Sequence, residues 1–143
     1  PSIAPYEVFD TADRALALAV GNDGQFRQCV AALGLADLAD DPRFGTNPLR
    51  VQHRGALRPL LQAALLARGA DDWTAAFSAV GVPCGPVNGI DEAFALATAL
   101  GLEPIREVDG LPTVANPIAF SRTPAEYRLR PPRVGDTDIE EVL

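Results

Sequence analysis

Asn22, Asp23 and Gln25 are the residues whose types and spacing come nearest to a ligand-binding site. They lie between the end of an expected strand and the start of an expected helix, where unpaired backbone N–H groups and the positive end of the helix dipole can face a ligand. Asn22 and Asp23 would equally suit helix capping, in which a side-chain oxygen accepts a backbone N–H and no ligand is needed. Residue chemistry alone therefore favours capping over binding.

His53 and Cys84 are the residues that could supply a base and a nucleophile. His53 is the only histidine of the chain, and its place beside Arg54 in a helical segment predicts an exposed residue. A cysteine nucleophile needs a base within hydrogen-bond distance, and nothing in the sequence places His53 near Cys84. Cys29 and Trp73 fall on apolar helical stripes and are expected in the core. The chain also lacks P-loop, dinucleotide-binding, nucleophile-elbow and paired-histidine motifs, so its signals for catalysis are poor and we expect no metal site in it.

Four arginines gather near the C-terminal end of the sequence, namely Arg122, Arg128, Arg130 and Arg133. Such a cluster could bind the phosphates of a nucleotide-like ligand, or pair with acids on another domain. A solvated cluster with no partner is the third interpretation, and the default one.

Composition narrows the class of protein. The 143 residues carry 12 basic and 19 acidic side chains, and this net charge of −7 argues against a nucleic-acid-binding surface. Hydrophobic residues make up 48% and charged residues 22%, which is typical of a globular domain. No apolar run has the length of a membrane span, and two cysteines without zinc-binding spacing suit reduced thiols. We therefore expect a cytoplasmic protein that binds neither nucleic acid nor membrane.

Apolar periodicity predicts strands and helices in one α+β unit. The alternation over 6–10 predicts a strand, which pairs as a hairpin with the apolar run 15–20. Three or four helices are predicted, and the candidates between capping and stop residues are Asn22 or Asp23 to Gly34, Asn47 to Gly69, Asp71 to Gly81, and Asp91 to about Leu100. The segment 82–89, with two prolines and two glycines, is predicted as a loop.

The chain changes character after the fourth helix. A second hairpin is predicted over 105–108 and 111–115, with Asp109-Gly110 as its turn. Residues 116–135 carry four prolines and little periodicity, which predicts an extended segment. We therefore divide the chain into a small α+β domain over 1–115 and an extended tail over 116–143.

Both ends suggest a piece of a longer protein. The chain contains no methionine, and residues 136–143 have the pattern of a helix that begins at Asp136 and stops after about two turns. We therefore expect a fragment.

The order of short segments resembles the small domain and C-terminal stretch of the class III CoA-transferases, the CaiB/BaiF family. The matching segments, in family order, are Pro5-Tyr6, Ala19-Val20-Gly21-Asn22-Asp23, Gln25-Phe26, Leu33-Gly34, Asp41-Pro42-Arg43-Phe44, Arg50 with Arg54, Trp73, Gly81-Val82-Pro83-Cys84-Gly85-Pro86-Val87, Thr123-Pro124, Pro131-Pro132 and Gly135-Asp136-Thr137. The sequence departs from the family at Asp13-Arg14, where an Asp-Gly turn is usual, at His53, and over 98–104.

This resemblance implies a function and its partners. Members transfer CoA from an acyl-CoA to a carboxylic acid through an aspartyl-CoA thioester, with coenzyme A as a substrate moiety and no permanently bound cofactor. The nucleophilic aspartate belongs to a large domain that precedes the region present here, so no residue of this chain matches it. The family also implies that two full-length chains interlock as a homodimer, and that the small domain closes over the acyl end of the substrate.

Related α-methylacyl-CoA racemases place an acid just before Pro-Gln-Phe near their proton-transfer residues. Asp23, before Gly24-Gln25-Phe26, occupies the similar place in this sequence. The resemblance therefore makes Asn22, Asp23 and Gln25 the candidate substrate-facing residues. The alternatives are a racemase of the same superfamily and a free-standing, non-catalytic interaction module.

Overall fold

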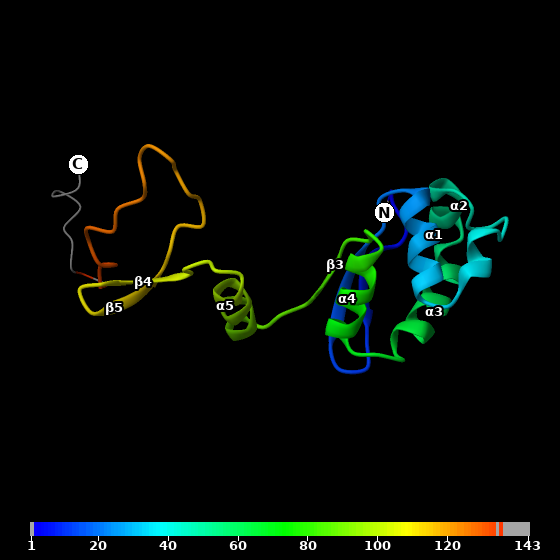
Figure 1. Cartoon of the computed structure of the whole chain (residues 1–143), viewed down its shortest axis with the longest axis horizontal. Coiled ribbons are helices and arrows are strands. Elements are labelled where there is room, and N and C mark those ends of the chain that lie inside the picture. The colour runs from blue at the N-terminus through cyan, green and yellow to red at the C-terminus, as the bar shows by residue number, and fades with distance from the viewer. Residues whose placement is uncertain (1, 134, 136–143) are drawn as a thin grey trace. The chain divides into compact units, whose positions relative to one another are not determined.

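The computed structural model describes residues 2–133 and 135 (Figure 1). Its contacts divide the chain into two units, Pro1–Val87 and Asn88–Leu143, and each is described by itself. The architecture is α+β, as expected. The expected division into a small domain over 1–115 and a tail over 116–143 is based on how the tail would meet a further domain, and it stays a prediction.

A three-stranded antiparallel sheet, in the order β1-β2-β3, forms one layer of the first unit. The strands are β1 (Tyr6–Asp10), β2 (Ala15–Ala19) and β3 (Cys84–Pro86). The first hairpin confirms its prediction, with Tyr6 opposite Ala19 and Asp10 opposite Ala15. β3 was wrongly expected as a loop, because a three-residue strand that contains Gly85 and Pro86 has no alternating pattern to detect.

The helices of the first unit cover one face of this sheet. They are α1 (Asp23–Ala32), the 3₁₀ turn η1 (Ala36–Ala39), α2 (Asn47–Gln52), α3 (Arg54–Leu65) and α4 (Ala70–Ala79). The core between the layers contains Phe9, Leu16 and Leu18 from the strands. Trp73 and Cys29 lie in this core, as predicted, and the Trp73 indole N–H donates to the Leu65 carbonyl oxygen at 2.8 Å.

The single long helix expected from Asn47 to Gly69 is wrong. The backbone leaves the helical region at His53 (φ −102°, ψ 21°), so α2 ends and α3 begins there. Gly55 and Pro59 weaken helix formation just beyond this point, because glycine is too flexible and proline lacks an N–H. The buried apolar stripe, Leu57, Leu61 and Leu65, lies entirely within α3, so apolar periodicity could not reveal the break.

The N-caps differ from expectation at α2 and α4. Asn22 caps α1 as predicted, and Gly34 and Gly81 follow α1 and α4 with positive φ. Thr46, not Asn47, is the N-cap of α2. Gly69, not Asp71, is the N-cap of α4.

The acceptor at the start of α4 comes from the turn between β1 and β2. The Asp13 Oδ1 atom accepts from the Ala70 N–H at 2.8 Å and from the Thr11 hydroxyl at 2.7 Å. Arg14 in the same turn forms an ion pair with Asp71. Asp13, which is far from α4 in sequence, therefore supplies the capping acceptor that we expected from Asp71. Its bond to Ala70 joins the hairpin turn to α4.

The second unit contains one helix and one hairpin. α5 (Ile90–Ala99) begins at Gly89, whose N–H donates to Glu92 Oε2 at 2.8 Å, and not at Asp91 as expected. β4 (Ile105–Val108) and β5 (Leu111–Val114) pair as predicted around Asp109 and Gly110, which have φ of 51° and 75°. Two successive positive φ values are typical of the tight turns that Asp-Gly forms.

The described residues after Val114 form neither helix nor strand, and the expected extended tail stays a prediction. The helix expected from Asp136 lies outside the described residues. No helix within the described part of the chain is both long and apolar enough to cross a membrane.

We expect Asp13→Ala to lower the melting temperature of the chain by a few degrees, because the Ala70 N–H at the start of α4 would lose its acceptor. The bond from Ala70 is the chief reason why the pKa of Asp13 lies below its ordinary 3.8. A depressed folded-state pKa stabilises the fold above the ordinary pKa, and this contribution is lost as the pH falls through the lowered value. Thermal unfolding between about pH 7 and about pH 2 should show the wild-type advantage disappear in acid.

Asp10→Ala is the matched control, because Asp10 lies at the other end of the same turn and its carboxylate makes none of these bonds. An Asp13→Ala protein as stable as this control at neutral pH would contradict the capping role.

Candidate functional site

The loop before α1 is closed by side chains of its own residues. Asn22 Oδ1 accepts from the Gln25 N–H at 2.9 Å, and Gln25 Oε1 accepts from the Gly21 N–H at 2.8 Å. These reciprocal bonds satisfy two donors that the helix start would otherwise leave unpaired. The predicted site residues Asn22 and Gln25 thus form one rigid turn.

Gln25 also reaches a second segment of the chain. Its Nε2 atom donates to the carbonyl oxygen of Gly81 at 3.3 Å, just before the chain enters β3. The loop at α1 and the segment that leads into Cys84-Gly85-Pro86 are therefore held together, although they are far apart in sequence.

Asp23, the third predicted residue, is held by α2. Its Oδ1 atom accepts from the Asn47 N–H at 3.0 Å and from Arg50 Nη2 at 2.8 Å. The Asp23 side chain keeps 49% of its surface exposed. Asp23 is therefore a partly exposed carboxylate, one oxygen of which is fixed by two donors from α2.

Arg50 is the residue that sequence reasoning missed. Its side chain is 0% exposed, and it donates from Nε to the Ala4 carbonyl oxygen at 2.8 Å and from Nη1 to the Phe44 carbonyl oxygen at 3.0 Å. The guanidinium carbon lies 4.4 Å from the centre of the Phe26 ring. The sequence held a signal for this burial, because Arg50 is seven residues before Leu57 and so lies in phase with the buried stripe of α3.

Four chain segments therefore meet around Asp23. Asn47 adds to the meeting point, because its side chain accepts from the Ala4 N–H at 3.1 Å and donates to the Ser2 carbonyl oxygen at 2.9 Å. We call the set Asn22, Asp23, Gln25, Asn47 and Arg50 the Asp23 cluster. It joins the N-terminal segment, the start of α1, α2 and the entry to β3.

The structure does not bring His53 and Cys84 together. His53 is half-buried at the break between α2 and α3, and not exposed on a helix as predicted, whereas Cys84 lies in β3 and packs against the core. Burial raises the pKa of the Cys84 thiol, and burial raises that of Cys29 to about 12. Neither cysteine has the depressed pKa of a nucleophilic thiol.

The arginines near the C-terminal end are exposed in the structure. Arg128 forms an ion pair with Glu126, two residues away. A phosphate-binding role for Arg122, Arg130 and Arg133 stays a prediction.

No group of three or more His, Cys, Asp or Glu side chains in the described part of the chain is arranged to hold a metal ion.

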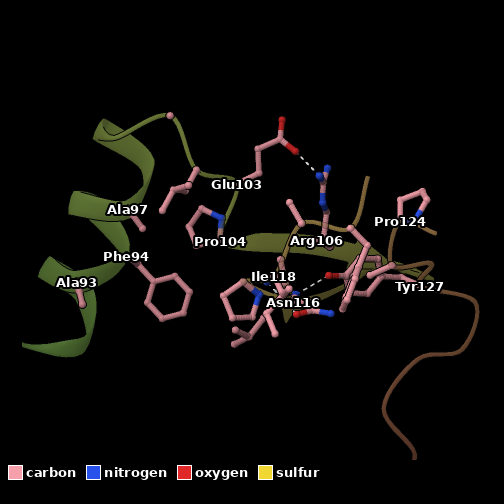
Figure 2. A pocket seen from close by; sticks show the side chains of 18 residues that line it. Ala93, Phe94, Ala97, Glu103, Pro104, Arg106, Asn116, Ile118, Pro124 and Tyr127 are labelled. Carbon is pink, nitrogen blue, oxygen red and sulfur yellow. Dashed lines mark hydrogen bonds and ion pairs between the residues drawn. The ribbon is translucent and has the colours of Figure 1, made fainter. Parts of the chain in front are cut away.

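The second unit contains a pocket of about 640 Å³ (Figure 2). Phe94 and Ala97 of α5 line one side of it, and Ile118 belongs to the facing wall. The polar groups of the lining are paired with one another: Arg106 with Glu103, and the Tyr127 hydroxyl with the Asn116 N–H. The remaining surface is mainly apolar, so the pocket lacks the converging polar groups of a reaction centre.

Comparison with known proteins gives a consistent answer. A model of CoA-transferase family III matches residues 1–138. The chain is 43% identical over 141 residues to succinate–glutarate CoA-transferase of Agrobacterium fabrum, covering 95% of this chain and 35% of that protein. It is 31% identical over 121 residues to acetyl-CoA:oxalate CoA-transferase of Acetobacter aceti, covering 85% and 31% respectively.

A solved structure agrees. The crystal structure of a CaiB/BaiF family protein from Brucella suis superimposes with a TM-score of 0.80 and 36% identity, over 93% of this chain and 35% of that one. The chain thus spans about a third of the length of these proteins. Because the family model matches nearly every residue and fold and sequence agree, the chain belongs to CoA-transferase family III.

Proposed function

We propose that this chain is the small-domain and C-terminal part of an enzyme that transfers CoA from an acyl-CoA to a dicarboxylic acid. The observation that carries the proposal is the 43% identity, over 95% of the chain, to a protein named for succinate and glutarate. The relative named for oxalate supports the same class, because oxalate is also a dicarboxylic acid. Coenzyme A is then part of the substrate, and no permanently bound cofactor is needed.

In this proposal the covalent chemistry is supplied from outside the chain. The nucleophile of the family is an aspartate that forms an aspartyl-CoA thioester, and no residue of this chain matches it. The raised pKa values of both cysteines agree with a supporting role for this region. The chain alone is then inactive, and its function is to shape the site and exclude water from it.

The Asp23 cluster is the surface of this chain that we propose faces the substrate. Asn22 and Asp23 are exposed, and Gln25 is half-buried in a turn closed by hydrogen bonds. Exposed polar groups that are held rigidly suit an active-site wall, because little ordering is needed when the substrate binds.

The second unit is proposed to pack against the part of the enzyme that this chain lacks. Among its described residues, Val108 is the buried large hydrophobic residue, at 5% exposed. Ile90, Leu100 and Ile118 are 60% or more exposed. Apolar surface of this extent is normally covered in a folded protein, and the relatives are about three times as long as the chain.

Interlocking as a homodimer and a cytoplasmic location stay predictions.

We expect the full-length protein to transfer CoA from succinyl-CoA to glutarate, and Asp23→Ala to lower kcat about tenfold or more, because a fixed wall group is lost. Steady-state kinetics with CoA thioesters separated by chromatography measure both. Asp71→Ala is the matched control: Asp71 is also an acidic first-turn residue paired with an arginine, and we expect its kcat to be unchanged.

Unchanged kinetics of Asp23→Ala with several acyl-CoA donors would contradict the substrate-facing role. A wild-type protein that exchanges the α-proton of 2-methylacyl-CoA but transfers no CoA would favour the racemase. If the source cell makes this protein with a mass of only about 15.1 kDa and it has neither activity, the result would favour a free-standing interaction module.

We expect backbone amides of 88–133 to exchange with deuterium much faster in the isolated chain than in the full-length protein, because they lose their cover. Residues 6–79 contain the buried core and serve as the internal control, with similar protection in both proteins. Hydrogen exchange followed by mass spectrometry gives both comparisons. Equal protection of 88–133 in the two proteins would contradict the proposed packing.

A further inference from the structure

We infer that Arg50 is a positioning residue for CoA transfer, acting through Asp23. The inference rests on the proposed function, in which Asp23 faces the substrate. It adds a residue that makes no contact with the substrate itself and whose task is to fix the direction of the Asp23 carboxylate.

Arg50 is unusually well immobilised for an arginine. Its side chain is 0% exposed, two of its nitrogens bond to the backbone oxygens of Ala4 and Phe44, and its guanidinium carbon lies over the Phe26 ring. These three contacts come from the N-terminal segment, the loop before α2 and α1. The third nitrogen, Nη2, is thereby held at one place, because the guanidinium group is planar and rigid.

Asp23 is the ion-pair partner of this buried cation. Burying a charge is costly unless an opposite charge is paired with it, so the pair has a strong reason to stay formed. The two partners differ in environment, since Arg50 is fully buried whereas the Asp23 side chain is 49% exposed. One end of the ion pair is therefore anchored in the core and the other end is at the surface.

Both bonds to Asp23 converge on the same oxygen. Arg50 Nη2 and the Asn47 N–H both donate to Oδ1, at 2.8 Å and 3.0 Å. With Oδ1 fixed, rotation about the last bond of the side chain is blocked, and Oδ2 is presented in one direction. A carboxylate oxygen held in this way is an acceptor that need not be ordered again in each catalytic cycle.

A purely structural role for Arg50 is the competing explanation, since Arg50 also ties Ala4 and Phe44 to α2. The two explanations differ in how Arg50 and Asp23 depend on each other. A structural arginine affects turnover whether or not position 23 is an acid. A positioning arginine affects kcat only while there is a carboxylate to position.

The test is a double-mutant cycle in the full-length protein, with kcat and KM for succinyl-CoA and glutarate and the melting temperature as readouts. Arg50→Lys keeps the charge but cannot hold all three partners at once. We expect it to lower kcat about tenfold in the wild-type background and by less than about twofold in the Asp23→Asn background. Asp23→Glu keeps the charge but moves the oxygens by one methylene, and we expect kcat to fall about fivefold or more with little change in melting temperature.

Arg54→Lys is the matched control, because Arg54 also bonds one carboxylate through two nitrogens, that of Glu7, and neither residue belongs to the Asp23 cluster. It should leave kcat unchanged in both backgrounds. An equal loss of kcat for Arg50→Lys in both backgrounds would overturn the inference and leave the proposed function standing. If Arg50→Lys fails to fold, full kcat in Asp23→Glu overturns the inference instead. A wild-type protein without CoA transfer overturns the proposed function and this inference with it.

Discussion

The buried cation at Arg50 is the constraint on which the first unit depends. A charged guanidinium group without access to water needs compensating partners, and three hydrogen bonds and the face of the Phe26 ring supply them. Those partners come from the N-terminal segment, α1 and the loop before α2. The same atoms that compensate the charge therefore fix how these segments meet. The exposed loop at α1 is held in place through the bond between Asp23 and the buried Arg50.

The two units are stabilised in different ways. The first has a continuous apolar core, with Leu16, Phe26, Leu61 and Phe77 each almost without exposed surface. The second has regular hydrogen bonds in α5 and in the β4–β5 hairpin, but no residue of α5 is buried. Hydrogen-bonded elements without a core are only marginally stable by themselves. The second unit is thus formed locally, whereas the first is held together by contacts between segments far apart in sequence.

Local signals explain what could be predicted from the sequence. Alternation over 6–10, the cap at Asn22 and the Asp-Gly turn at 109–110 depend on neighbouring residues only, and the structure confirms all three. The strand β3, the cap that Asp13 supplies to α4 and the break at His53 depend on distant or single-residue effects, which periodicity does not carry. The same holds at the candidate site. The loop at Asn22, Asp23 and Gln25 could be found from residue types, but Arg50 beneath it appeared to be a surface arginine, because charged residues are rarely fully buried.

The raised pKa values of Cys29 and Cys84 have a consequence for the proposed chemistry. An acyl-CoA thioester is an electrophile that any nearby thiolate can attack. Such an attack releases CoA and leaves the acyl group on the cysteine, so substrate is consumed and no new acyl-CoA is formed. Burial raises the pKa of both thiols, that of the buried Cys29 to about 12 and that of the half-buried Cys84 above its ordinary value, so both favour the protonated form near neutral pH. A region with these two thiols that closes over an activated acyl group would therefore present few thiolates to it, so more of the acyl group would be left for the acceptor acid.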